Sequence, residues 1–326
     1  MSDTDSWNGT KDRQGRHRKQ TPFQGIQEKA RLLEQGMHKD KQTFQFLYKT
    51  SLRHLPAATL REDHGFVIQG LDLKTGEPAM HGNRFIEPIH PAEIRGWVNK
   101  YCFWGIGETR AQLGPLGYSA YPKSTRPFYD AETLKREISM MLDQGLFRIG
   151  NIREKESLWR RARIELDGLQ REYRPNCHWA VRDIFQQARS SQLEDPFEPN
   201  LTQNEHHPHV QCIVLDNEPL ADNNYVSVAE LTTILKVAGD VARIPQFKNV
   251  DTIPVTVFSF SNRKVRIVQG CVNFRTRKHD IRCSDIMDFT YSFCRTEESV
   301  FNVCTLLGWM VGRPVGDVVQ PQSCPA

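Results

Sequence analysis

The chain has 326 residues, of which 38% are hydrophobic and 10% aromatic, and its formal net charge at pH 7 is +4. This composition excludes a wholly disordered chain, because enough apolar side chains are present to bury compact cores, and the length predicts two domains. The small charge excess excludes any inference of nucleic-acid binding from net charge alone.

Eight cysteines occur without a Cys-x-x-Cys pair, and most of them lie in apolar runs where a thiol behaves as a small hydrophobe. This usage predicts a reducing compartment, the cytoplasm or the nucleus. The first forty residues lack the apolar core of a signal peptide, and the most hydrophobic stretch, residues 300–311, is too short to cross a bilayer. We therefore expect a soluble protein without membrane attachment.

Residues 1–22 are expected to form a disordered basic tail, because they offer few apolar side chains to offset the entropy of ordering. A mainly helical module is predicted over residues 23–191. It begins with a helix over about residues 24–52. A glycine- and proline-rich region follows at 62–128, where turns, short strands and ordered loops are expected.

Three further helices are predicted in this module. The first follows Asp130, which stands where an N-cap belongs, and ends at Gly145. Apolar stripes at helical spacing predict the second helix over about residues 154–173 and the third over about residues 176–189. Together these helices indicate a helical layer.

Residues 192–208 contain three prolines and no apolar period, so we interpret them as a linker. An α+β domain is expected over residues 209–319, followed by a flexible tail at 320–326. The first strand of this domain is predicted over residues 209–216.

A helix is predicted to begin after Ser227 and to end at Gly239, because Ser227 and Glu230 have the spacing of a capping box. Three apolar runs follow at 254–260, 265–274 and 281–289.

The three runs are separated by polar turns and are rich in Val, Ile and Phe, which predicts an antiparallel meander. Helical spacing over residues 300–311 predicts a closing helix. The expected fold class is therefore α+β, with a helical N-terminal layer followed by a small antiparallel sheet packed with two helices.

The last third of the chain resembles a group of uncharacterised proteins of filamentous fungi. Four segments carry the resemblance: IPVTV at 253–257, VRIVQG at 265–270, IMDF at 286–289 and GRPVGD at 312–317. In that group a strand, R-(I/V)-L/V-Q/H, a strand, D-F, a helix and P-(I/V)-G-D close the chain. The resemblance implies a fungal lineage and a recurring fold element, and it implies no site or activity.

The strongest electrostatic feature is the segment 263–282, called the basic hairpin below, where seven cations accompany one acid, Asp280. Guanidinium groups in turns and at strand ends could hold phosphate oxygens, with Phe274 as a stacking face. Charges at such positions also serve solubility and discourage edge-to-edge pairing, which is the alternative interpretation. The seven cations are Arg263, Lys264, Arg266, Arg275, Arg277, Lys278 and Arg282.

His207 and His209 point to the same side of an extended chain, so their imidazoles could share a metal ion, although the spacing matches no zinc motif. The alternative is that both lie at the polar end of a linker. Residues 105–110 (GIGETR) lack the third glycine of a dinucleotide fingerprint and are interpreted as a tight turn.

The residues indicate no cofactor and assign no catalytic group. We expect an intracellular fungal binding or scaffolding protein, without an evident catalytic site, that has a macromolecular partner. Two alternatives stay open: a binder of nucleic acid or a phosphate ligand through the basic hairpin, and an enzyme of an undetected class in fungal metabolism.

Overall fold

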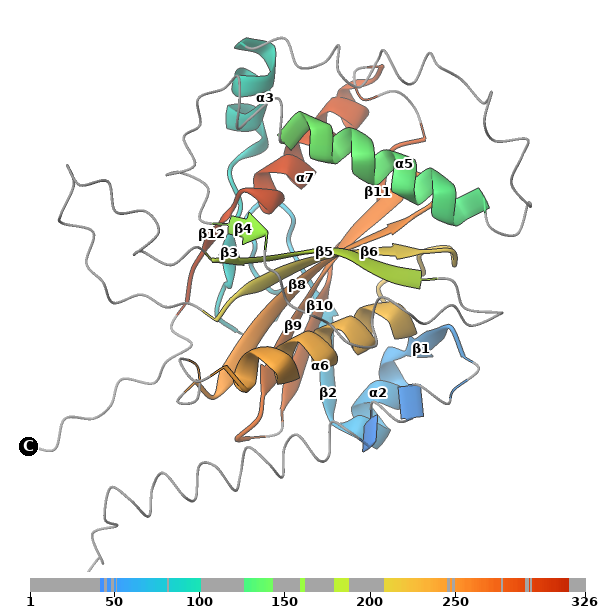
Figure 1. Cartoon of the computed structure of the whole chain (residues 1–326), viewed down its shortest axis with the longest axis vertical. Helices are drawn as coiled ribbons and strands as arrows, with labels where there is room; N and C mark the ends of the chain where they lie inside the picture. Colours follow the sequence, from blue (N-terminus) through green and yellow to red (C-terminus); the bar gives the residue numbers. More distant parts are fainter. Residues whose placement is uncertain are drawn as a thin grey trace, which may run out of the picture.

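The computed structural model describes part of the chain, with a large β-sheet at its centre and helices on both faces (Figure 1). The tails at 1–22 and 320–326, the turn at 105–110 and residues 192–207 lie outside the described residues. The described residues are 42–43, 46–47, 50, 52–80, 82–100, 126–142, 159–161, 179–187, 208–244, 247, 250–276, 278–290, 293 and 295–316.

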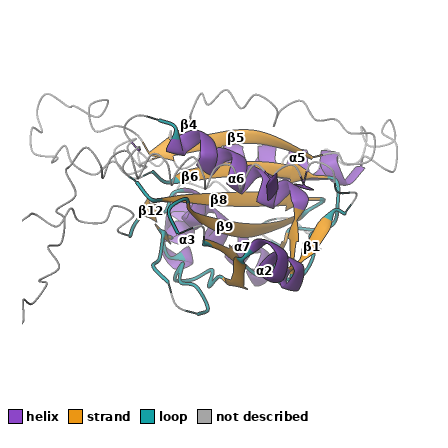
Figure 2. Cartoon of the chain, turned by 90° about the horizontal axis from the view of Figure 1, so that it is seen from below, coloured by secondary structure: helices purple, strands orange, loops and turns teal. Residues whose placement is uncertain are grey.

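The sheet is mixed. β2 runs parallel to β10, and β6 runs parallel to β8, whereas the other neighbours along the sheet are antiparallel. Figure 2 shows β5, β6, β8 and β9 side by side with α6 in front of them. The spatial order is β2 (Phe66–Gly70), β10 (His279–Cys283), β9 (Lys264–Asn273), β8 (Thr252–Ser261), β6 (Val210–Asp216), β5 (Trp179–Gln187) and β4 (Trp159–Arg161), with β11 (Met287–Asp288) paired to one end of β9.

Two short ribbons lie beside the main sheet. β1 (His54–Pro56) pairs with β7 (Tyr225–Ser227), and β12 (Arg313–Pro314) pairs with β3 (Ile86–Glu87). Each ribbon joins segments that are far apart in the sequence, so residues 54–56 and 86–87 are both paired with segments of the C-terminal third.

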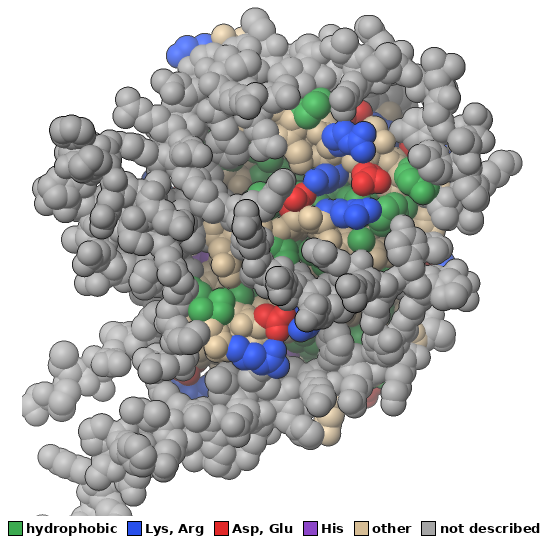
Figure 3. All heavy atoms as spheres, in the orientation of Figure 1, with side chains coloured by type: hydrophobic (Ala, Val, Ile, Leu, Met, Phe, Trp, Pro, Cys, Tyr) green, Lys and Arg blue, Asp and Glu red, His purple; other side chains and the backbone are tan. Residues whose placement is uncertain are grey.

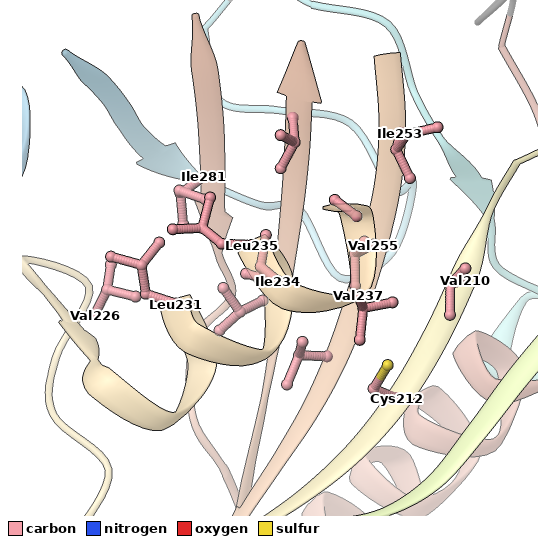
Figure 4. Close-up of a cluster of buried hydrophobic side chains, with 14 of the residues drawn as sticks. Val210, Cys212, Val226, Leu231, Ile234, Leu235, Val237, Ile253, Val255 and Ile281 are labelled. Atoms are coloured by element: carbon pink, nitrogen blue, oxygen red, sulfur yellow. The ribbon is translucent and has the colours of Figure 1, made fainter. Parts of the chain in front are cut away.

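One face of the sheet is covered by α6 (Val228–Ala242), with α2 (Ala57–His64) beside it (Figure 1). The predicted capping box is confirmed: Ser227 Oγ accepts the N–H of Glu230 at 3.1 Å, and the Glu230 carboxylate accepts the N–H of Ser227 at 2.8 Å. Leu231 and Ile234 of α6 point toward the sheet, among valines of the central strands (Figure 4). The predicted stop at Gly239 is wrong, because α6 continues to Ala242.

The opposite face is covered by α5 (Arg126–Met140) and α7 (Glu297–Met310), and α3 (Pro91–Lys100) packs against α7. The strands alternate between the two layers, as the pleat of a strand requires. On β8, Val255 and Val257 join the core beneath α6, whereas Phe258 and Phe260 join the core beneath α5 and α7.

The prediction of a small antiparallel sheet is wrong. The sheet is large and mixed; it takes β4 and β5 from segments predicted to be helices, and β2 from the glycine- and proline-rich region. The predicted strand at 209–216, the pairing of the runs that form β8, β9 and β10, and the closing helix are confirmed. Strands on both sides of residues 192–208 therefore belong to one sheet.

The predicted helix over 176–189 is also wrong, because residues 179–187 form β5. A register shift between Val181 and Asp183 moves the buried positions out of strict alternation, so that Val181, Ile184 and Phe185 imitate the spacing of a helix face. Of the predicted helix over 154–173, only β4 is described, and it is a strand. α5 begins at Arg126, so Asp130 lies inside that helix rather than at its cap.

Gly270 allows α6 to approach β9 closely. A Cβ at this position would lie 2.2 Å from Cγ2 of Ile234, so Gly270→Ala should lower the free energy of unfolding by about 1–3 kcal/mol through overpacking. Urea denaturation measures this loss, and adding Ile234→Ala should make the Gly270→Ala change milder.

Gly239→Ala is the matched control. Gly239 lies inside α6, and an added Cβ there has no neighbour within 4 Å, so this change should stabilise the protein by about 0.5–1 kcal/mol. Equal effects of the two glycine substitutions would contradict the close packing of α6 on β9.

Candidate functional site

The structure gives most cations of the basic hairpin an acidic partner. Arg277 lies outside the described residues, and Lys278 is exposed. The remaining pairs are Arg263 with Glu137, Lys264 with Asp288, Arg266 with Glu230, Arg275 with Asp251, and Arg282 with Asp280.

Arg266 and Glu230 form a fully buried ion pair between β9 and the first turn of α6. Nε of Arg266 donates to Oε1 of Glu230 at 2.8 Å, and an Nη2 bond to Oε2 completes a bidentate contact. Nη1 of Arg266 donates to the carbonyl oxygens of Ala221 and Asp222 at 2.9 and 3.3 Å. The guanidinium group therefore binds the helix and the preceding loop together.

Burial alone would raise the pKa of Glu230, but the charge and hydrogen bonds of Arg266 outweigh it, so the pKa lies below its ordinary value. Burial likewise opposes the charge of Arg266, and Glu230 raises the pKa of that guanidinium. Both groups are therefore ionised at neutral pH. A carboxyl whose pKa is lowered by folding adds stability above its ordinary pKa, and this stability is lost as the pH falls through the folded value.

Arg282 is the second buried cation of the hairpin. Its Nε donates to Asp280 at 2.8 Å, and its Nη1 donates to the carbonyl oxygen of Asn83 at 2.7 Å. The guanidinium carbon lies 4.4 Å from the centre of the Phe85 ring. Arg282 thus holds the segment before β3 on the sheet and does not face solvent.

The other hairpin cations lie nearer the surface. Arg263 donates to the buried Glu137 of α5 at 3.0 Å, and Arg275 lies 2.9 Å from Asp251. On the face around α5, basic side chains also lie next to acidic ones, so no patch of a single charge sign forms there (Figure 3). Most of the positive charge in the described part of the hairpin is therefore neutralised by acidic side chains of the same chain.

His209 is buried, and its Nε2 lies 3.1 Å from the carbonyl oxygen of Val315. His207, its predicted companion, lies outside the described residues. Within the part of the chain that the structure describes, no group of three His, Cys, Asp or Glu side chains is arranged to hold a metal ion.

A row of polar side chains crosses the sheet on the α7 side, in register over five strands. Its members are Gln69, Arg282, Gln269, Thr256 and Gln211, and all five are buried. The row binds the backbone of the covering segments. Gln69 accepts the N–H of Met80 at 2.9 Å, and Gln211 donates to the carbonyl oxygen of Trp309 at 3.2 Å.

Four cysteines among the described residues are free thiols. Burial raises the pKa of Cys271 and of Cys283 to about 12, and that of Cys304 to about 11. Since the thiolate is the nucleophilic form, these thiols are unreactive at neutral pH and contribute to packing.

The strand β2 forms one edge of the sheet. Leu71 donates its N–H to Cys283 on β10, and Gly70 accepts from Ala79 on the opposite side. Because backbone groups of successive residues point to alternate edges, those of Phe66 and Ile68 point outward, where no backbone group of a described residue pairs with them. Both residues are nevertheless buried, at 1% and 6% exposure. Beside this edge Val67 and Met80 are 40% and 56% exposed. Phe66, Val67, Ile68 and Met80 are called the β2 edge below.

The sequence does not predict the β2 edge or the buried role of Arg266. In a strand, the pattern Val265-Arg266-Ile267 places the arginine on the face opposite its apolar neighbours. When both faces of the strand are covered, the arginine is buried and needs an acidic partner in the core. The β2 edge gave no such signal, because its position depends on pairing with β10, more than 200 residues later.

Comparison of the chain with protein-family models, with curated proteins and with solved structures finds no match. The resemblance to fungal proteins therefore stays a prediction. None of the helices in the described segments is long and apolar enough to cross a membrane.

Removing one partner of the buried pair should be costly. Arg266→Met leaves the Glu230 carboxylate buried without its cation, so we expect a loss of about 3–5 kcal/mol in the free energy of unfolding. Urea denaturation of Arg266→Met, Glu230→Leu and the double variant forms a cycle. The double variant should be clearly more stable than the sum of the single effects predicts, and additive single effects would refute the pairing.

Proposed function

We propose that the protein binds another polypeptide through the β2 edge, as a binding or scaffolding protein of the fungal cytoplasm or nucleus. The single observation that carries this proposal is the pair of exposed apolar side chains, Val67 and Met80, beside a strand whose outward backbone groups have no described backbone partner. An extended segment of a partner can add to such an edge through main-chain hydrogen bonds when Phe66 and Ile68, which are 1% and 6% exposed, become accessible.

The composition of the edge supports binding. Natural edge strands are usually protected by charged side chains, proline or bulges that prevent another strand from pairing. Residues 66–70 (FVIQG) contain neither a charge nor a proline. The charges and prolines that discourage pairing are therefore absent from β2.

The partner best suited to this edge is an extended segment with apolar side chains at alternate positions. Val67 lies on the same face of β2 as Gln69, which holds the N–H of Met80. Side chains of the added strand on this face would meet Val67 and Met80. The internal pairing of the basic hairpin gives less support to the alternative of a phosphate or nucleic-acid ligand.

Val67→Lys should weaken partner binding while leaving the fold intact, because it places a charge at an exposed position of the edge. Proximity labelling with the full chain identifies the partner, and titration of the purified partner measures the affinity. We expect at least a tenfold weaker affinity for Val67→Lys, in line with the loss of about 1.4 kcal/mol of binding free energy.

Phe301→Lys on α7 is the matched control, since Phe301 is 41% exposed and lies away from β2. This variant should bind as the wild type does. If the wild type recovers no partner above background, or if Val67→Lys and Phe301→Lys bind equally well, the β2 edge is not the binding surface.

A further inference from the structure

Loop 217–224, which connects β6 to β7, is bound to the sheet by side chains from three strands. Oδ1 of Asp216, at the end of β6, accepts the N–H of Glu218 at 3.0 Å. Ser261 on β8 donates its hydroxyl to the carbonyl oxygen of Glu218. Arg266 on β9 donates to Ala221 and Asp222. The closed position of the loop therefore depends on a cluster of polar and charged groups.

The loop in turn holds the segment around β1. The carboxylate of Glu218 forms an ion pair with Arg53. The N–H of Ala57 donates to the carbonyl oxygen of Asn224 at 2.8 Å, and the N–H of Val228 donates to that of Arg53 at 2.9 Å. Together with the pairing of β1 and β7, these contacts make residues 53–57 and 217–228 one connected unit.

Three carboxyl groups in and beside this unit are not exposed, and two of them have a cationic partner. Glu218 and Glu230 are paired with Arg53 and Arg266. Asp216 is 5% exposed, and no cation among the described residues pairs with it. An ionised Asp216 would therefore add a buried negative charge without a cation beside two pairs that are already neutral.

The cations near Asp216, Arg53 and Arg266, already neutralise Glu218 and Glu230 and do not compensate a charge on Asp216. At its register in the sheet, β5 contributes Trp179 and β8 contributes Ser261. The titratable and charged groups that face the cluster are Glu230 from α6, Arg266 from β9, Cys283 from β10, Glu218 and Asp222 from the loop, and Arg53 before β1.

Burial raises the pKa of Asp216 to about 7, and the negative charges of Glu230 and Glu218 add to this effect. The backbone N–H groups of Glu218 and Asn217 act in the opposite direction. The carboxyl group of Asp216 therefore changes its charge near neutral pH, whereas an exposed aspartate would be fully ionised there.

We propose that Asp216 controls a pH-sensitive latch: loop 217–224 and the β1–β7 ribbon stay closed on the sheet while its carboxyl group is protonated, and its ionisation favours their opening. The proposal does not depend on the β2 edge or on a partner. It makes the docking of residues 53–57 respond to the pH of the surroundings.

The direction follows from linkage. A carboxyl group that holds its proton more tightly in the closed state favours closing at low pH. This stabilisation of the closed state is lost as the pH rises from the ordinary pKa of an aspartate to the raised pKa of Asp216. Above the raised pKa it does not return. With a closed-state value near neutrality, the opening constant should increase about tenfold between about pH 6 and about pH 8.

Hydrogen exchange of the full chain tests the latch. Protection factors, corrected for intrinsic exchange rates, are compared for residues 53–57 and 217–227 at both pH values. The wild type should show about tenfold lower protection at the higher pH. Asp216→Asn and Asp216→Ser both keep an acceptor for the N–H of Glu218 but cannot ionise, so their protection should not change with pH.

Asp285→Asn provides the matched control, because Asp285 accepts a hydrogen bond from Asn223 of the same loop at 2.9 Å but is exposed. This variant should keep the pH dependence of the wild type. The latch is refuted if wild-type protection is equal at both pH values, or if a folded Asp216 variant still shows the tenfold change. The wild-type comparison decides the question even if the Asp216 variants fail to fold.

Discussion

The buried ion pair between Arg266 and Glu230 is the interaction on which the arrangement of this protein depends. One carboxylate caps α6 through the N–H of Ser227 and also neutralises a guanidinium group of the central strand β9. Burying Glu230 or Arg266 without the other would be very costly in free energy. α6 and β9 therefore have one favourable position relative to each other. The same guanidinium group closes loop 217–224. The pair thus connects the sheet, a helix and a loop at one point.

The opposite face of the sheet follows a different principle. The segments that cover it near β3 and β12 are irregular, and their backbone groups need partners when they are buried. The polar row supplies them from strand positions that would otherwise be apolar, with Gln69, Gln211 and Arg282 each bound to a backbone group of the cover. Polarity in the centre of this sheet is therefore explained by packing, and the exposed side chains of the β2 edge, Val67 and Met80, remain the best candidate for recognition.

The sequence predicted the elements that depend on local patterns. The capping box at Ser227 and the strongly apolar runs of β8 and β9 gave clear signals, because their stabilising contacts are close in sequence. β5 was misread because its register shift breaks the alternation of a strand. β2 was hidden in a glycine-rich region, since its pairing with β10 is a long-range contact. α3 was also missed, although Pro91 at its first position and Glu93 in its first turn are helix-start signals.

The candidate site was predictable only in part, because the number of cations in the basic hairpin says nothing about their acidic partners on other elements. The most direct test of the account is an NMR titration of the Glu230 carboxyl group in the full chain. If Arg266 is its buried partner, Glu230 will titrate below the ordinary value of a glutamate, because the cation outweighs burial. A titration above that value would show a buried carboxyl group without a cation, and would contradict the central role of the pair.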